Sequence, residues 1–322
     1  MNKIKEFIKN ISPFNNRTDM PKLLYVIKVI LIFWVFKFGA ELVGEGIVLA
    51  IHFACGKNPL QGEMFGDITI TLITYSGYGV MIGIIILLWK LFQRKTLAEL
   101  GLARPAWSYF AGAGAGALLL LVSVALAVLT GAVRYNGVFR NIDTAMVFLM
   151  LGAFIFQGAF EEVLCRGIVQ QLLQKKSIPV AVGVSTALFI IPHIGNMDFS
   201  APAIAVTAVI NLILISVIFS LLTIRFKSIW AACGLHSIWN YILYSILGLN
   251  LSGNDEIITA VFDMSSVGDN ILNGGKYGIE ASIITTAVLV AAAIALIVFN
   301  IRKPERGTGP RDRNVIDEAL FE

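Results

Sequence analysis

Charged residues are scarce in this sequence. Asp, Glu, Lys and Arg make up 14% of its 322 residues, whereas hydrophobic residues make up 57% and the mean hydropathy is +0.79. A typical soluble domain carries about 25% charged residues, so this chain lacks the polar side chains that cover a water-exposed surface. The composition excludes a soluble enzyme, a disordered chain and a nucleic-acid-binding domain. It predicts a multi-pass integral membrane protein.

Cysteine is also scarce. Cys55, Cys165 and Cys233 form an odd, scattered set, which excludes a disulfide framework and a Cys-x-x-Cys metal pair. The first 22 residues are polar and basic, and the apolar run after them is too long for the core of a signal peptide. We therefore expect an anchor that is retained in the membrane.

Long apolar runs, by contrast, are abundant. A helix needs about 20 apolar residues to cross a bilayer, and lipid offers its backbone no other hydrogen-bond partners. The predicted fold class is an all-α polytopic membrane helix bundle of about eight transmembrane helices. The candidate spans are 23–51, 67–93, 107–131, 144–172, 178–195, 201–224, 228–248 and 281–301. A polar N-terminus at 1–22 and a polar tail at 302–322 flank this transmembrane domain at 23–301.

Lys and Arg residues alternate between the two sides of the predicted bundle. Eighteen of the 25 fall in the N-terminus, the tail and every second connection, if Lys90 at the end of the second span is counted with the connection after it; four fall in the other connections, and three lie within spans. Cytoplasmic loops carry the excess of positive charge, so both termini are expected in the cytoplasm. The long acidic connection at about 249–280 is then an outer loop.

Three glycines alternate with alanine at positions 112, 114 and 116. A nucleotide-binding loop would need a preceding strand and a soluble helix after it, and the sequence offers neither. The spacing Gly112-x-x-x-Gly116 instead predicts close packing of two membrane helices.

Polar side chains within three of the spans indicate a functional site, because ionisable groups are costly in a membrane. In the fourth span, Glu162 and Arg166 are four residues apart and are expected to form an ion pair on one helix face. Glu161 points about 100° away from Glu162. A poorly solvated carboxylate in that position is suited to act as a general base.

Two further pairs have the same four-residue spacing. Phe189 and His193 share a face of the fifth span, and His236 and Asn240 share a face of the seventh. At about 1.5 Å per residue from the cytoplasmic ends, Glu161, His236 and His193 lie roughly 16, 12 and 22 Å deep. These depths favour a single site in the bundle, with His193 as the outlier.

The three patterns together resemble the CPBP family (CAAX protease and bacteriocin-processing enzymes, or Abi family), which is related to the type II CAAX prenyl endopeptidase. Its pattern is Glu-Glu-x-x-x-Arg, Phe-x-x-x-His and His-x-x-x-Asn or Asp on successive helices. Here these are Glu161-Glu162-x-x-x-Arg166, Phe189-x-x-x-His193 and His236-x-x-x-Asn240. The resemblance covers about residues 144–248, the expected catalytic core.

The resemblance implies an intramembrane endopeptidase with Glu161 as the group that activates the attacking water. His193, His236 and Asn240 would hold that water or stabilise the oxyanion. Glu162, Arg166 and Phe189 would have supporting roles, with the Glu162–Arg166 pair orienting Glu161. One divalent metal, such as Zn²⁺ on Glu161, His193 and His236, is the alternative arrangement. The expected partners are membrane lipid and a peptide or protein substrate that is prenylated or small, in a bacterial plasma membrane.

Two other functions fit the same sequence. An ion-coupled transporter is suggested by Lys37, Glu41 and Glu45 in the first span. A non-catalytic immunity or scaffold protein would keep the motifs and act by binding. A transporter would retain partial binding after Glu161→Gln, whereas a protease would lose cleavage.

Overall fold

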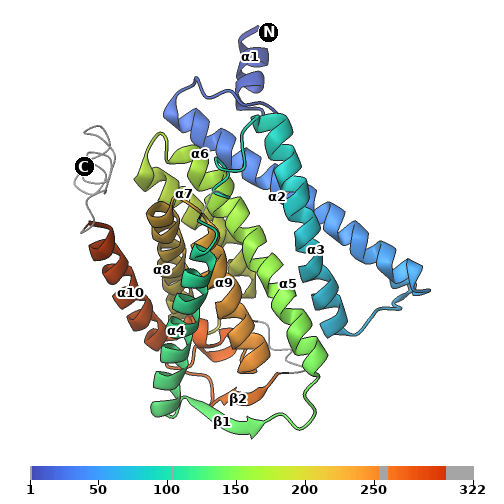
Figure 1. The fold of residues 1–322 in the computed structure, drawn as a ribbon, viewed down its shortest axis with the longest axis vertical. Coiled ribbons are helices and arrows are strands. Elements are labelled where there is room, and N and C mark those ends of the chain that lie inside the picture. Colours follow the sequence, from blue (N-terminus) through green and yellow to red (C-terminus); the bar gives the residue numbers. More distant parts are fainter. Residues whose placement is uncertain (1, 103–104, 254–259, 302–322) are drawn as a thin grey trace.

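The computed structural model describes residues 2–102, 105–253 and 260–301, and its fold is a bundle of helices with one small sheet (Figure 1). The tail predicted at 302–322 lies outside the described residues. The α-helices are α1 (Asn2–Ile11), α2 (Lys22–Ala54), α3 (Asp67–Leu88), α4 (Ser108–Leu129), α5 (Thr144–Glu162), α6 (Gln171–Leu173), α7 (Ile178–Ile190), α8 (Pro202–Phe226), α9 (Trp230–Tyr241) and α10 (Ile283–Ile301).

Seven helices of the described chain are long and apolar enough to cross a membrane, and each coincides with a predicted span. The predicted seventh span, 228–248, is α9 followed by a π-helical segment, Ile242–Ile246, and this unit is shorter than the other seven. Most of α9 is buried inside the bundle. The polytopic helical fold class is therefore confirmed. Which side of the membrane each end faces stays a prediction.

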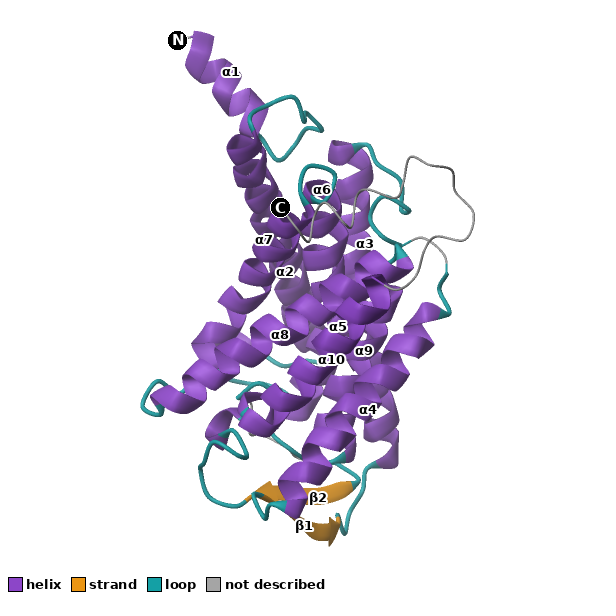
Figure 2. Ribbon diagram, turned by 90° about the vertical axis from the view of Figure 1, so that its left-hand side faces the viewer, coloured by secondary structure: helices purple, strands orange, loops and turns teal. Residues whose placement is uncertain are grey.

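A two-stranded antiparallel sheet was not predicted. Strand β1 (Val133–Val138) pairs with β2 (Phe262–Ser266), which lies within the long connection expected as a loop. The sheet lies at the opposite end of the molecule from α1 (Figures 1 and 2). Two 3₁₀ turns, Gly275–Tyr277 and Ile279–Ala281, follow β2 and lead into α10.

Two departures from α-helical geometry bring the motif residues into position. Helix α5 continues as a π-helix, Val163–Gln170, which contains Arg166 and joins α6. Helix α7 ends at Ile190 and continues as a 3₁₀ helix, Ile191–Asn196. Pro192 accounts for this second change, because proline has no N–H and its ring clashes with the preceding helical turn. His193 follows directly in the tighter helix.

Helices α4 and α9 approach each other closely at the glycines of α4. A Cβ atom built on Gly112 would lie 1.8 Å from the carbonyl oxygen of Ala231, and one on Gly116 would lie 2.6 Å from that of Leu235. A Cβ atom built on Gly114 would meet no atom of another segment within 4 Å. The predicted Gly112-x-x-x-Gly116 contact is confirmed, and it fixes the position of α9, which carries His236 and Asn240.

Candidate active site

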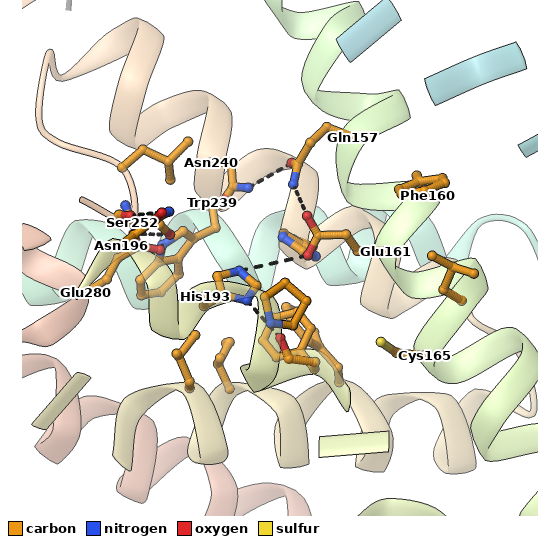
Figure 3. Close-up of a pocket in the computed structure, with 18 of the residues that line it drawn as sticks. Gln157, Phe160, Glu161, Cys165, His193, Asn196, Trp239, Asn240, Ser252 and Glu280 are labelled. Carbon is orange, nitrogen blue, oxygen red and sulfur yellow. Dashed lines mark hydrogen bonds and ion pairs between the residues drawn. The ribbon is translucent and has the colours of Figure 1, made fainter. Parts of the chain in front are cut away.

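A cavity of about 330 Å³ lies among the helices. Its lining includes Glu161 of α5, His193 of the 3₁₀ helix after α7, and His236 and Asn240 of α9. The structure thus brings together the four side chains singled out as catalytic, as Figure 3 shows for three of them.

Glu161 faces the cavity, and its two carboxylate oxygens have different neighbours. Oε1 accepts a hydrogen bond from Gln157 Nε2 at 2.5 Å, and Oε2 lies 4.0 Å from His193 Nε2 (Figure 3). The side chain of Glu161 is 27% exposed and that of His193 is 17% exposed. A separation of 4.0 Å is too long for a direct hydrogen bond and is compatible with a water molecule that bridges the two groups. Glu161 and His193 therefore lie side by side, although the depths estimated from helix rise placed His193 deeper than Glu161.

The tautomer of His193 follows from its other nitrogen. Nδ1 lies 2.8 Å from the carbonyl oxygen of Phe189, which can only accept, so Nδ1 carries the hydrogen. In the neutral ring Nε2 is then an acceptor directed toward Glu161. Phe189, predicted as a supporting residue, provides this carbonyl and packs its ring 4.9 Å from the imidazole.

Gln157 connects Glu161 to Asn240. Its Nε2 donates to Glu161, while its Oε1 accepts a hydrogen bond from Asn240 Nδ2 at 2.9 Å. The amide of Gln157 is therefore oriented by both neighbours, and α5 is tied to α9 beside the cavity. Gln157 was not predicted as a site residue, although its position one turn before Glu161 on an apolar helix is a usable signal.

Glu162 and Arg166 form the predicted ion pair, with Nη1 and Oε1 3.1 Å apart and both side chains fully buried. The pair was expected to orient Glu161, but its contact is with His236. Glu162 Oε1 lies 3.0 Å from His236 Nδ1. The carboxylate accepts from both neighbours, so Nδ1 carries the hydrogen and Nε2 is left available at the cavity.

Aromatic rings and hydroxyl groups enclose this buried charge. The Arg166 guanidinium lies between the rings of Phe189 and Phe219, 4.8 and 4.9 Å from their centroids. Its Nη2 donates to the carbonyl oxygen and to Oγ of Ser216 at 3.0 and 2.5 Å. Phe219 also stacks on His236, with ring centroids 5.1 Å apart. Arg166 and Phe189 thus contact the surroundings of His236 and His193, whereas the Glu162–Arg166 pair was predicted to orient Glu161.

Two groups of residues outside the motifs complete the cavity wall. One group comes from α2 and α3 and includes Lys37 and Glu41, which form an ion pair, with Tyr75 and Tyr78. The other comes from the sheet end of the bundle and includes Glu280. Burial raises the pKa of the Glu280 carboxyl above its ordinary value, while hydrogen bonds from Ser252 act in the opposite direction.

The predicted metal set does not form a preassembled site. Among the described residues, no three His, Cys, Asp or Glu side chains are grouped closely enough to hold a metal ion. Glu161, His193 and His236 line the same cavity, and each histidine uses Nδ1 for a protein contact, His236 with Glu162 and His193 with a backbone carbonyl, which leaves each Nε2 free to bind water or a metal ion.

The fold and the cavity define the class of protein: an integral membrane helix bundle with a cavity among its helices that polar and aromatic side chains line. Residues 143–242, about a third of the chain, match the family model described as type II CAAX prenyl endopeptidase Rce1-like. The match is to the family that the three motifs resemble, and it covers nearly the same residues as that resemblance, 144–248. No curated protein and no solved structure matches the chain.

Proposed function

We propose that this protein is an intramembrane endopeptidase in which Glu161 activates a water molecule to hydrolyse a peptide bond. The observation that carries the proposal is the facing pair of Glu161 Oε2 and His193 Nε2, 4.0 Å apart on the wall of a cavity. A water between them donates one hydrogen to each group. Its oxygen lone pair is then free to attack a carbonyl carbon.

The steps follow from the donors and acceptors at the cavity. Glu161 takes the proton as the water attacks, and the carbonyl oxygen gains negative charge. Two donors are available for that oxyanion. One is the second N–H of Asn240, and the other is Nε2–H of His236 when its ring is protonated on both nitrogens. Glu161 then delivers its proton to the leaving amine. Gln157 holds Glu161 through Oε1 and leaves Oε2 for the water.

The proposed substrate is a peptide that is prenylated or otherwise membrane-associated, reached from the lipid of a bacterial plasma membrane. The aromatic wall formed by Phe33, Tyr75, Tyr78 and Phe160 supports an apolar substrate group next to Glu161.

The test uses purified full-length protein in lipid vesicles and two internally quenched peptides ending in a CAAX-type sequence, one farnesylated and one not. Wild type is expected to cleave the farnesylated peptide, and Glu161→Gln is expected to lower kcat by at least about 10³-fold while the protein still folds. Full cleavage by Glu161→Gln, or no cleavage of either peptide by wild type, contradicts the proposal. Retained peptide binding without cleavage in wild type would favour the transporter or scaffold alternative.

Metal removal is a separate prediction. Because the water is held by Glu161 and His193 alone, wild-type activity is expected to persist after dialysis against a strong chelator. Loss of activity that Zn²⁺ restores, at a stoichiometry of one ion per chain, would instead support the metal arrangement on Glu161, His193 and His236.

A further inference from the structure

A polar cap outside the family-matched segment closes the sheet end of the cavity. We define the cap as residues 249–253 and 275–282. Four of its side chains line the cavity: Leu251, Ser252, Tyr277 and Glu280. A backbone hydrogen bond joins the two parts of the cap: Gly253 N donates to the carbonyl oxygen of Tyr277 at 3.1 Å. The cap thus leads directly into α10, which begins at Ile283.

Glu280 joins the cap to α9. Its Oε1 accepts a hydrogen bond from Trp239 Nε1 at 3.1 Å, and Trp239 directly precedes Asn240 in α9. Its Oε2 accepts from the backbone N and the hydroxyl of Ser252 at 2.7 and 3.0 Å (Figure 3). One carboxylate therefore fixes the helix that carries Asn240 and the loop that carries Ser252.

Ser252 in turn joins the cap to the helix that carries His193. Its carbonyl oxygen accepts a hydrogen bond from Asn196 Nδ2 at 3.1 Å, three residues after His193. The loop passes so close that a Cβ atom on Gly253 would lie 2.7 Å from the carbonyl oxygen of Asn196. Ser252 itself has a φ of +50°, a left-handed conformation that a non-glycine residue adopts only when its surroundings fix it.

We propose that Glu280 is a positioning residue of the hydrolytic site: it holds Asn240 through Trp239, and His193 through Ser252 and Asn196. This inference rests on the proposed endopeptidase function. Glu280 does not itself act on the water in this scheme, because three donors already occupy its two oxygens. Its role is to keep the α9 side and the 3₁₀-helix side of the cavity at a fixed separation, on which attack geometry depends.

The principal test is Glu280→Gln, measured with the farnesylated quenched peptide in vesicles. The amide oxygen still accepts from Ser252, but the amide nitrogen cannot accept from Trp239. A positioning role predicts that kcat falls by about 10-fold or more while KM stays within about twofold. Asp198→Asn is the matched control, because it makes the same change in an exposed ion pair with Lys276 of the cap. It is expected to leave both constants unchanged.

Trp239→Phe is the second variant, and it removes the indole donor while keeping an aromatic ring. If Glu280 acts through Trp239, the double variant with Glu280→Gln loses about as much kcat as either single variant. If the kcat losses of the two single variants multiply in the double variant, the positioning role is overturned. An increase in KM with unchanged kcat also overturns it and would make Glu280 a substrate contact. If Glu280→Gln does not fold, Trp239→Phe with an unchanged kcat overturns the proposal by itself.

Wild type and Glu161→Gln are measured in parallel with these variants. Cleavage by wild type that is lost in Glu161→Gln, together with unaltered kinetics of Glu280→Gln, refutes the role of Glu280 alone. Cleavage that survives Glu161→Gln refutes the proposed function, and the role of Glu280 falls with it.

Discussion

The contact between α4 and α9 makes a sharp prediction about Gly112. In Gly112→Ala the new methyl group would lie 1.8 Å from the carbonyl oxygen of Ala231 and 2.9 Å from its Cα. The obstructing atoms belong to the backbone, so no side chain can turn aside. Either the whole of α9 moves or the two helices separate.

The size of the effect follows from this geometry. Ordinary contacts begin near 3.4 Å, so the backbone of α9 must shift by about 1.6 Å if the rest stays fixed. Overpacking of this kind costs about 1–3 kcal/mol of folding free energy. Because α9 carries His236 and Asn240, a shift of about 1 Å at the site is also expected to lower kcat by about 10²-fold.

The assay compares Gly112→Ala with Gly114→Ala, since nothing lies within 4 Å of the Cβ position at Gly114. Both variants are purified in the same detergent, and thermal unfolding and peptide cleavage are measured. At about 2–4 °C per kcal/mol, Gly112→Ala is expected to unfold about 5 °C lower, whereas Gly114→Ala stays near wild type. Equal unfolding temperatures and equal kcat for the two variants would refute the close approach of α4 and α9.

Two further predictions concern the polar network. Gln157→Leu removes the donor to Glu161 and the acceptor for Asn240, so kcat is expected to fall by about 10-fold or more with little change in the unfolding temperature; a wild-type kcat would show that Glu161 needs no such partner. Arg166→Met removes the guanidinium paired with the buried Glu162, which keeps only its contact with His236, and is expected to cost about 3–5 kcal/mol of stability. Adding Glu162→Gln should recover part of that stability but not the cleavage, and a double variant that is no more stable than Arg166→Met alone would contradict this account.

Much of the fold could be predicted from hydropathy, because a membrane helix is specified by the length and polarity of one continuous segment. The ion pair of Glu162 and Arg166 was predictable for a similar reason, since residues four apart share a helix face. The glycine spacing likewise predicted a close helix contact, although the identity of the partner, α9, depends on the tertiary arrangement.

The remaining features depend on contacts between distant segments. Glu280 lies about 40 residues after Trp239 in a connection with no helical period, and nothing local distinguishes it from the other acidic residues there. The contact of Glu162 with His236 joins two helices whose relative rotation the sequence does not specify. The sheet was missed because β1 and β2 are short and pair across more than a hundred residues.

The division between the family-matched segment and the rest of the chain bears on how specificity would arise. Residues 143–242 contain Glu161, His193, His236 and Asn240, which are the groups assigned to the reaction. Much of the wall that a substrate would touch comes from α2, α3 and the cap, which lie outside that segment, and the matched segment adds Phe160 and residues of α7 and α8. Replacing α2, α3 and the cap with the corresponding segments of a relative would alter which peptide fits, while the groups around the water would stay in place. Substrate choice is therefore expected to follow the sequence of α2, α3 and the cap rather than the motifs.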